Sequence, residues 1–404
     1  MKIYQVGGSV RDQILGKTPK DRDWLVVNSS VENMLRLGYK PVGKDFPVFL
    51  HPQTKEEYAL ARVERKIENK RGHGDFSFYY APDVSVEDDL LRRDLTINAI
   101  AIDDQGKLVD PFGGEQDIKN KILRNVSKAF SEDPLRILRV ARFSAQLPEF
   151  TIADETLLLM QKMVANEDLA FLSAERIWQE LVRGLAEKKP RKMFEILSNI
   201  GALKKILPEV DNLKGVPQKK SRHPEKDVFE HTMLTMEAIT KLTTKPHIRF
   251  AALCHDLGKA MTAKEYLPAH PNHHLQGVNI IEKLAKRLKI PSKFNHISKL
   301  SCRWHDAVFK LEQDPKNLEL WFDLITGIDL WRRPWQLDEL LLVANADFQG
   351  RPNYLNTEFK FLNIVKQISD QVKKSLINQM ITDKNSRDNL IRLNIEKAVF
   401  NMFA

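Results

Sequence analysis

Residues 3–27 read IYQVGGSVRDQILGKTPKDRDWLVV, and this stretch decides how the chain begins to fold. A short apolar run ends at Gly7 and Gly8, a segment with a helical pattern comes next, and a second apolar run begins at Asp21 and Asp23. This order predicts a strand, a glycine turn, a helix and a second strand. Two carboxylates then stand where the second strand starts.

The glycine turn suits the binding of an anion. Backbone N–H groups near Gly8 can approach an anion closely because no Cβ is in the way. The N-terminus of the adjoining helix favours negative charge, and Arg11 supplies a forked donor for phosphate. Taken alone, Gly-Gly is more often an ordinary tight turn, so the interpretation depends on the neighbouring residues.

The two carboxylates have the spacing of a metal site. Residues i and i+2 of a strand point to the same face, so Asp21 and Asp23 aim together and Arg22 points away. Mg²⁺ prefers a few carboxylates together with substrate oxygens. Two such ions, about 3.5–4 Å apart, clamp the attacking and leaving oxygens of an in-line displacement. Beside the glycine turn, the pair favours a phosphate-transfer site over two unrelated loop residues.

The combined motif resembles the GG-x-V-R-D … D-x-D signature of nucleotidyltransferases of the DNA polymerase β superfamily. More narrowly, it is similar to class II tRNA nucleotidyltransferases, which include CCA-adding enzymes and bacterial poly(A) polymerases. The resemblance implies that Asp21 and Asp23 are catalytic Mg²⁺ ligands and that Gly8 and Arg11 hold the triphosphate. In a charged, glycine-rich loop, Glu64 is a candidate base for the RNA 3′-hydroxyl, with a solvated strand end as the equal alternative.

Residues 87–100, EDDLLRRDLTINAI, carry an arginine pair and an aspartate before an apolar run. A lone RRD triplet is usually surface charge. Here it resembles the family's RRD-x-T-x-N-A motif. The resemblance implies that Arg93, with Arg92 and Asp94, contacts the incoming nucleotide and that Asn98 helps to shape the pocket.

Residues 132–143, EDPLRILRVARF, predict a helix with three arginines at a spacing of three. The pattern alone fits equally well a helix capped by Asp133 with a basic outer face. ED-x-x-R followed by R-x-x-R resembles the family's nucleotide-selecting helix. That resemblance implies base selection by Asp133 and Arg136, with Arg139 and Arg142 also near the nucleotide.

The chemistry of base selection agrees with this assignment. Cytosine and adenine both present an amino donor beside a ring-nitrogen acceptor, which a carboxylate such as Asp133 and a guanidinium such as Arg136 complement. Guanine and uracil present a carbonyl where the amino group should be. Their binding leaves buried groups unpaired, at a cost of about 1–3 kcal/mol per group.

A second group of chemically active residues lies within residues 228–330. A lone histidine on an apolar helix is more often a satisfied core residue than a ligand, but two His-Asp doublets with a separate histidine and aspartate are hard to explain by packing. Imidazole and carboxylate suit divalent metals such as Mn²⁺, Ni²⁺ or Zn²⁺. The order H…HD…D resembles the HD-domain phosphohydrolases.

That second resemblance implies a set of metal ligands and a reaction. The implied ligands are His231, His255, Asp256 and Asp329. The implied reaction is attack of a metal-bound water on a phosphoester. His273 and His305, with Asp306, are candidates for a second ion or the phosphate, although the loop at His273 departs from the expected glycine-rich form.

Composition bounds the remaining expectations. The 404 residues carry 63 Lys and Arg against 54 Asp and Glu, which gives a net charge of +9 and is compatible with a polyanionic partner. Two cysteines, no signal-like N-terminus and no run of 18 apolar residues predict a cytoplasmic protein with no membrane span.

We expect an α+β fold, with a small N-terminal sheet-and-helix head followed by a helical neck, body and HD domain. The expected parts are a nucleotidyltransferase head with its selecting helix at 1–143, a tRNA-binding neck and body at 144–213, a basic linker at 214–227, the HD domain at 228–330 and a helical tail without separate chemistry at 331–404.

The two resemblances together imply a class II tRNA nucleotidyltransferase fused to an HD phosphohydrolase. Its partners are tRNA, CTP and ATP, its form is a monomer or homodimer, and it adds C, C and A with Mg²⁺ and without a template, releasing pyrophosphate. The HD site then uses Ni²⁺, Mn²⁺ or a similar ion as a phosphatase, 2′-nucleotidase and 2′,3′-cyclic phosphodiesterase. A poly(A) polymerase, or an HD phosphohydrolase with a non-catalytic tRNA-binding head, is the alternative.

Overall fold

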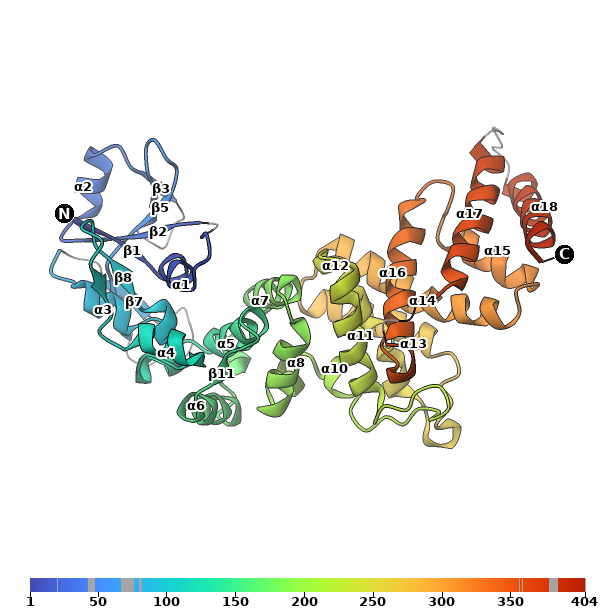
Figure 1. Cartoon of the computed structure of the whole chain (residues 1–404), viewed down its shortest axis with the longest axis horizontal. Helices are drawn as coiled ribbons and strands as arrows, with labels where there is room; N and C mark the ends of the chain where they lie inside the picture. Colours follow the sequence, from blue (N-terminus) through green and yellow to red (C-terminus); the bar gives the residue numbers. More distant parts are fainter. Residues whose placement is uncertain are drawn as a thin grey trace. The chain divides into compact units, whose positions relative to one another are not determined.

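The structure is a computed structural model that divides into two compact units. One contains Met1–Glu180 and Asn199–Lys205, and the other contains Leu181–Ser198 and Ile206–Ala404. The strands lie in the N-terminal part of the chain, and the yellow to red part is helical (Figure 1). The described residues are 1–19, 21–42, 48–66, 76–79, 82–355, 357, 359–377 and 384–403.

The predicted strand, turn, helix and strand are confirmed at the start of the chain. They are β1 (Lys2–Val6), α1 (Gly8–Ile14) and β2 (Asp23–Val27), and β1 pairs with β2 in antiparallel fashion. Within the described residues they belong to a seven-stranded sheet of order β3-β4-β5-β2-β1-β8-β9. The other strands are β3 (Lys40–Val42), β4 (Val48–Leu50), β5 (Glu57–Leu60), β8 (Ala101–Ile102) and β9 (Leu108–Val109).

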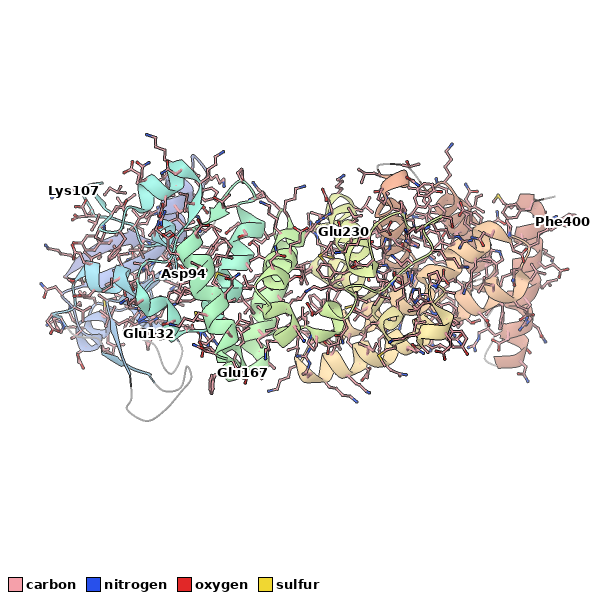
Figure 2. All side chains as sticks on the ribbon, turned by 90° about the horizontal axis from the view of Figure 1, so that it is seen from below. Asp94, Lys107, Glu132, Glu167, Glu230 and Phe400 are labelled. Atoms are coloured by element: carbon pink, nitrogen blue, oxygen red, sulfur yellow. The ribbon has the colours of Figure 1, made fainter. Side chains whose placement is uncertain are left out.

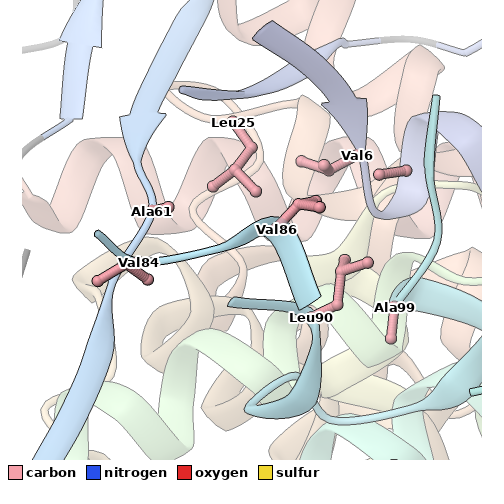
Figure 3. Close-up of a cluster of buried hydrophobic side chains, with 8 residues drawn as sticks. Val6, Leu25, Ala61, Val84, Val86, Leu90 and Ala99 are labelled. Carbon is pink, nitrogen blue, oxygen red and sulfur yellow. The ribbon is translucent and has the colours of Figure 1, made fainter. Parts of the chain in front are cut away.

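This sheet is buried on both faces, which explains the nearly continuous apolar runs of its central strands. Leu25 packs with Val6 and Leu90 on one face (Figure 3). Val26, the next residue, packs with Met34 on the other face. Successive side chains of a strand point to opposite faces, so β2 supplies both cores.

Short helices and strand pairs complete the N-terminal unit, and the helix predicted at residues 132–143 is present as α5. The elements are α2 (Val31–Arg36), the pair β6 (Val63–Lys66) and β7 (Phe76–Tyr79), α3 (Val86–Leu91), α4 (Gly114–Asn120), the parallel pair β10 (Ile122–Leu123) and β11 (Thr151–Ile152), α5 (Leu135–Gln146), α6 (Asp154–Ala165) and α9 (Ala202–Ile206). Helix α7 (Ala174–Ala186) begins in this unit.

The second unit is helical. Its helices are α8 (Pro190–Asn199), α10 (Pro208–Asp211), α11 (Val228–Leu242), α12 (Pro246–Cys254), α13 (His273–Arg287), α14 (Ser292–Gln313), α15 (Leu318–Gly327), α16 (Trp335–Gln349), α17 (Phe361–Ile377) and α18 (Lys384–Phe403). Among them, α14 packs against α12 and α13, and α11 packs against α16. The predicted α+β fold is therefore confirmed. Among the described residues we find no helix long and apolar enough to cross a membrane.

One glycine contact brings the histidine-bearing helices together. Gly258 comes just after the doublet His255-Asp256, and a Cβ at this position would collide with the carbonyl oxygen of His273. Gly277, one turn further along α13, also touches Gly258. The bare backbone at this contact lets the start of α13 lie against the turn after α12, because no side chain separates them.

Candidate active sites

A cavity of about 590 Å³ in the N-terminal unit collects the residues predicted to bind the nucleotide. They come from three separate stretches of the chain that the fold brings together. The predicted residues on its wall are Gly8, Arg11, Asp23, Arg93, Asp133, Arg136, Arg139 and Arg142.

The glycine turn lies directly beside Arg93. Gly7 has φ +72°, in the left-handed region that favours glycine, and a Cβ there would lie 2.8 Å from Arg93 Nη1. The backbone at Gly7 and the guanidinium of Arg93 can therefore be this close only without a side chain at Gly7. The turn and an arginine predicted to bind the same nucleotide thus share one wall.

Asp23 begins β2, and Asp21 lies just before the strand. Burial raises the pKa of Asp23, the Arg93 guanidinium lowers it and the Asp21 carboxylate raises it, with a net upward shift. A nearby negative charge has this effect because it disfavours a second ionised carboxylate. Among the described residues that line the cavity, Asp23 is present and Asp21 is not, so their joint binding of a cation stays a prediction.

Glu57 is a third carboxylate that the sequence analysis missed. In the parallel pairing of β2 with β5, Glu57 lies directly opposite Asp23, and both residues line the cavity. The side chain of Glu64, the third carboxylate considered from sequence, lies outside the described residues. Only the strand pairing identifies Glu57, because 34 positions of sequence separate it from Asp23.

Hydrogen bonds connect α1 to α5 through Asp94, a buried residue that is labelled in Figure 2. Arg11 Nη1 donates to Asn98 Oδ1 at 2.7 Å, and Asn98 Nδ2 donates to Asp94 Oδ1 at 3.0 Å. Arg139 Nε donates to Asp94 Oδ2 at 2.7 Å. Burial alone would raise the pKa of Asp94, but Arg139 and these hydrogen bonds lower it to about 2. Asp94 therefore acts as a buried anion that holds the cationic wall in place.

The arginines of α5 face inward, which excludes a basic outer face for this helix. Arg136 is 6% exposed and Arg142 is 9% exposed. Arg136 donates to the Ala129 carbonyl at 2.6 Å and to the Arg92 carbonyl at 2.5 Å, and Arg142 Nε donates to a Glu180 carboxylate oxygen at 2.7 Å. These bonds fix two guanidinium groups at the cavity wall.

Asp133, the carboxylate predicted to select the base, is also held from two sides. Its Oδ1 accepts from the backbone N–H of Leu135, the first residue of α5, at 3.1 Å. Its Oδ2 accepts from Arg176 Nη2 at 2.7 Å. Arg176 also lines the cavity, and the sequence analysis did not predict it because it lies in a helix further along the chain.

The second site is a cluster of buried histidines around Asp256. His255 Nε2 lies 3.1 Å from Asp256 Oδ2, and His273 Nε2 and His305 Nε2 each lie 3.5 Å from Asp256 Oδ1. His231 Nε2 lies 3.9 Å from Asp256 Oδ2. The fold thus gathers five of the seven predicted HD-site residues: His231, His255, Asp256, His273 and His305.

Backbone carbonyls orient three of these rings. In His255, Nδ1 donates to the Ala252 carbonyl at 2.7 Å. In His273, Nδ1 donates to the His270 carbonyl at 2.9 Å. In His305, Nδ1 donates to the Ser301 carbonyl at 3.0 Å. A carbonyl oxygen only accepts, so Nδ1 carries a proton, and in the neutral form of each ring the unprotonated Nε2 faces Asp256. This is the arrangement that metal-binding histidines adopt.

The donor set fits a divalent metal ion. Asp256 Oδ1 and the Nε2 atoms of His255 and His273 are buried and have no hydrogen-bond partner among the described residues. Imidazole lone pairs facing carboxylate oxygens bring acceptors together, which a cation stabilises. One ligand atom each of His231, His255 and Asp347 lies within 4.8 Å of the others, and the same holds for His255, Asp256 and His305.

Family models match both parts of the chain that contain these candidate sites. Residues 3–124 match the model of the poly A polymerase head domain, residues 149–214 a probable RNA- and SrmB-binding site of polymerase A, and residues 228–347 the HD domain. The chain is 45% identical over 404 residues to a multifunctional CCA protein of Mannheimia succiniciproducens, with 97% of this chain and 95% of the relative covered. The chain belongs to the multifunctional CCA protein family.

A second relative supports this assignment, and solved structures share the fold. The multifunctional CCA protein of Haemophilus influenzae is 45% identical, with 95% of this chain and 93% of the relative covered. A CCA-adding enzyme in complex with CTP is 22% identical at a TM-score of 0.63, with 98% and 87% covered. The Thermotoga maritima CCA-adding enzyme complexed with tRNA is 19% identical at a TM-score of 0.61, with 99% and 87% covered. These two structures share the fold, and the family identifies the chain as a nucleotidyltransferase.

The structure corrects one predicted ligand of the HD site. Asp329 lies just after α15, and its carboxylate accepts from Arg332 Nε at 2.9 Å instead of joining the cluster. Asp347 of α16 lies beside the cluster instead, with Oδ1 3.0 Å from His231 Nε2. The signal for Asp347 was present, since it shares the buried i, i+3, i+7 positions of α16 with Leu340 and Val343. The HD family model also extends to residue 347, beyond the expected boundary at 330.

Residues expected to form a basic linker lie against the same cluster. Glu225 Oε1 lies 2.9 Å from His231 Nδ1 and 2.8 Å from His223 Nδ1. Lys259 Nζ, 2.6 Å from Asp256 Oδ2, donates to Gln218 Oε1 at 2.8 Å. The segment before α11 therefore supplies the outer hydrogen bonds of the HD site.

Asp306, a weaker candidate for the HD site, lies outside the innermost group. Its carboxylate lies 2.9 Å from Lys310 Nζ. Burial alone would raise the pKa of Asp306, but His305 and Lys310 lower it. Asp306 lines a cavity next to the cluster. It belongs neither to the group of His231, His255 and Asp347 nor to the group of His255, Asp256 and His305.

Proposed function

We propose that this chain adds C, C and A to the 3′ end of tRNA from CTP and ATP and releases pyrophosphate. The gathering of the predicted nucleotide-binding residues on one cavity wall, beside Asp23, is the observation that carries this proposal. The names of the two relatives and the neighbours solved with CTP and with tRNA support it.

The residues divide the task between phosphate and base. Mg²⁺ bound by Asp21 and Asp23 supplies charge neutralisation for nucleotidyl transfer. Glu57, opposite Asp23, is proposed as a further carboxylate of this group. Gly8, Arg11 and Arg93 then bind the triphosphate through N–H donors.

Selection of the base is assigned to α5. Asp133 accepts the amino hydrogen that cytosine and adenine share, and Arg136 donates to the neighbouring ring acceptors. Two hydrogen bonds to backbone carbonyls hold the guanidinium of Arg136 at the cavity wall. Arg139 and Arg142 complete the cationic wall.

The test is incorporation of each of the four labelled nucleotides, singly and together, into a tRNA transcript lacking its 3′ CCA. Two C and one A and then a stop is the expected product with Mg²⁺. A long A tail would identify a poly(A) polymerase instead. No addition would leave the head as a tRNA-binding module and contradict the proposal.

We also propose that the HD site hydrolyses phosphomonoesters, including nucleoside 2′-phosphates, and 2′,3′-cyclic phosphates. His231, His255, Asp256 and Asp347 are the residues that would hold a Ni²⁺, Mn²⁺ or similar ion, with His273 and His305 adjacent. A divalent ion held there supplies a Lewis acid for phosphoester hydrolysis. Release of phosphate from 2′-AMP, compared across these ions and EDTA, tests the proposal, and absence of release with every ion would contradict it.

A further inference from the structure

A cavity of about 270 Å³ beside the histidine cluster has a wall that phosphate chemistry does not use. A metal site and a phosphate require the ligands and the cations, but they leave the aromatic side chains without a role. The lining includes cluster residues (His273, His305 and Asp347), cations (Arg222, Lys259 and Arg351) and aromatic residues (Phe309, Phe348 and Tyr354).

The aromatic residues form a continuous array. The ring centroids of Phe309 and Phe359 are 5.0 Å apart, and those of Phe359 and Phe348 are 4.5 Å apart, with interplanar angles of 11° and 10°. Tyr354 comes after Phe348 at 4.5 Å and 36°. Tyr354 is 39% exposed and lines the cavity, so aromatic surface remains available there.

Arg351 ties this array to the cluster. Its Nη2 lies 3.2 Å from Asp347 Oδ1, and its Cζ lies 4.5 Å from the centroid of the Phe309 ring. Phe348 is also the residue next to Asp347 on α16, and both residues line the cavity. A ligand whose phosphate lies at the cluster therefore has the aromatic array within reach of its remaining part.

We propose that Tyr354, backed by the stacked rings of Phe348 and Phe359, forms a subsite that stacks the base of a nucleoside phosphate held at the HD cluster. The proposal rests on the proposed hydrolysis and adds the residues that make it selective for nucleosides. Aromatic side chains stack any base because every base has a π-face. The subsite therefore favours nucleoside phosphates over base-free phosphoesters and tolerates different bases.

The test compares two substrates in the full chain with the same metal ion. Tyr354→Ala should raise KM for 2′-AMP about tenfold, the scale of stacking one base on one aromatic ring, with kcat changed less than about twofold. KM for glycerol 2-phosphate, which lacks a base, should stay within about twofold. Tyr354→Phe should restore the wild-type KM, since stacking needs the ring and not the hydroxyl.

Trp335→Ala is the matched control, because Trp335 is an exposed aromatic residue at the start of α16 and does not line this cavity within the described residues. A Tyr354→Ala variant that changes both substrates alike, or neither, overturns the subsite. If wild-type protein hydrolyses neither substrate, the proposed hydrolysis fails, and calorimetric binding of 2′-AMP in EDTA decides the subsite separately. Binding about tenfold weaker in Tyr354→Ala than in wild type supports it, and equal binding overturns it.

Discussion

The two candidate sites present opposite kinds of hydrogen-bonding group. The head cavity is lined by guanidinium donors such as Arg11, Arg93 and Arg139. The centre of the HD cluster instead collects acceptors, namely the Nε2 atoms of its histidines and the oxygens of Asp256. Donors in such number suit a polyphosphate, and converging acceptors suit a cation. The donors of the head cavity therefore indicate an anionic ligand, and the acceptors of the HD cluster indicate a cationic one.

The two sites also differ in how those groups are held. Arg136 bonds to a carbonyl 44 positions away, and Arg139 bonds to a carboxylate 45 positions away. The rings of His255 and His305 bond to carbonyls only three and four positions away. The head site therefore depends on the tertiary fold, whereas its own helices orient much of the HD site.

The largest effect is expected when the two carboxylates predicted to bind Mg²⁺ are removed from the head. Asp21→Ala with Asp23→Ala should lower CTP incorporation about a thousandfold or more, because the loss of several kcal/mol of metal stabilisation slows transfer by this factor. Phosphate release from 2′-AMP by the same preparation should stay within about twofold. Retained incorporation would refute the catalytic assignment.

A comparison of two aspartates tests which of them is a metal ligand of the HD site. Asp347→Asn should lower phosphate release about a hundredfold or more, since it removes an anionic ligand beside His231. Asp329→Asn should stay within about twofold, because Asp329 bonds to Arg332 instead. Metal content of the purified variants provides a second measurement. Equal losses in both variants would restore Asp329 to the ligand set.

A smaller effect is expected from the outer hydrogen bond to His231. Glu225→Gln should weaken metal binding about 10- to 100-fold, because the carboxylate orients the ring and increases its basicity. Glu230→Gln is the control, since Glu230 bonds to Arg191 and not to the cluster. Metal titration monitored by calorimetry measures both variants, and equal affinities would show that Glu225 has no role in binding.

The smallest effect concerns the pH dependence of the head's stability. Asp94 has its pKa lowered from 3.8 to about 2, which corresponds to about 2 kcal/mol of folding free energy. Because the folded-state pKa is depressed, this stability is present above pH 4 and is lost as the pH falls from about 4 to 2. Asp94→Asn should lack this dependence, and urea unfolding of both proteins at pH 7 and pH 3.5 measures the difference. Parallel losses of stability would exclude this role.

The sequence predicted those features that depend on short stretches. The strand, glycine turn, helix and strand lie within 25 residues, so local pattern sufficed. The buried position of Asp347 on α16 follows from its sequence period, but its partner does not, because 116 positions separate it from His231 and only the packing of α16 on α11 brings them together. Glu57 required the strand pairing of β2 with β5 for the same reason. Asp329 was chosen from the order of residues alone, which carries no information about distance.

The hydrogen bonds from Arg11 through Asn98 and Asp94 to Arg139 join the helix after the glycine turn to α5, the helix proposed to select the base. For protein engineering, this makes α5 a poor unit of exchange. A graft of α5 alone from a relative of different base preference would separate Arg139 from the anion that fits it. A chimaera that keeps both functions has to carry the segment with Asp94 and Asn98 together with the helix.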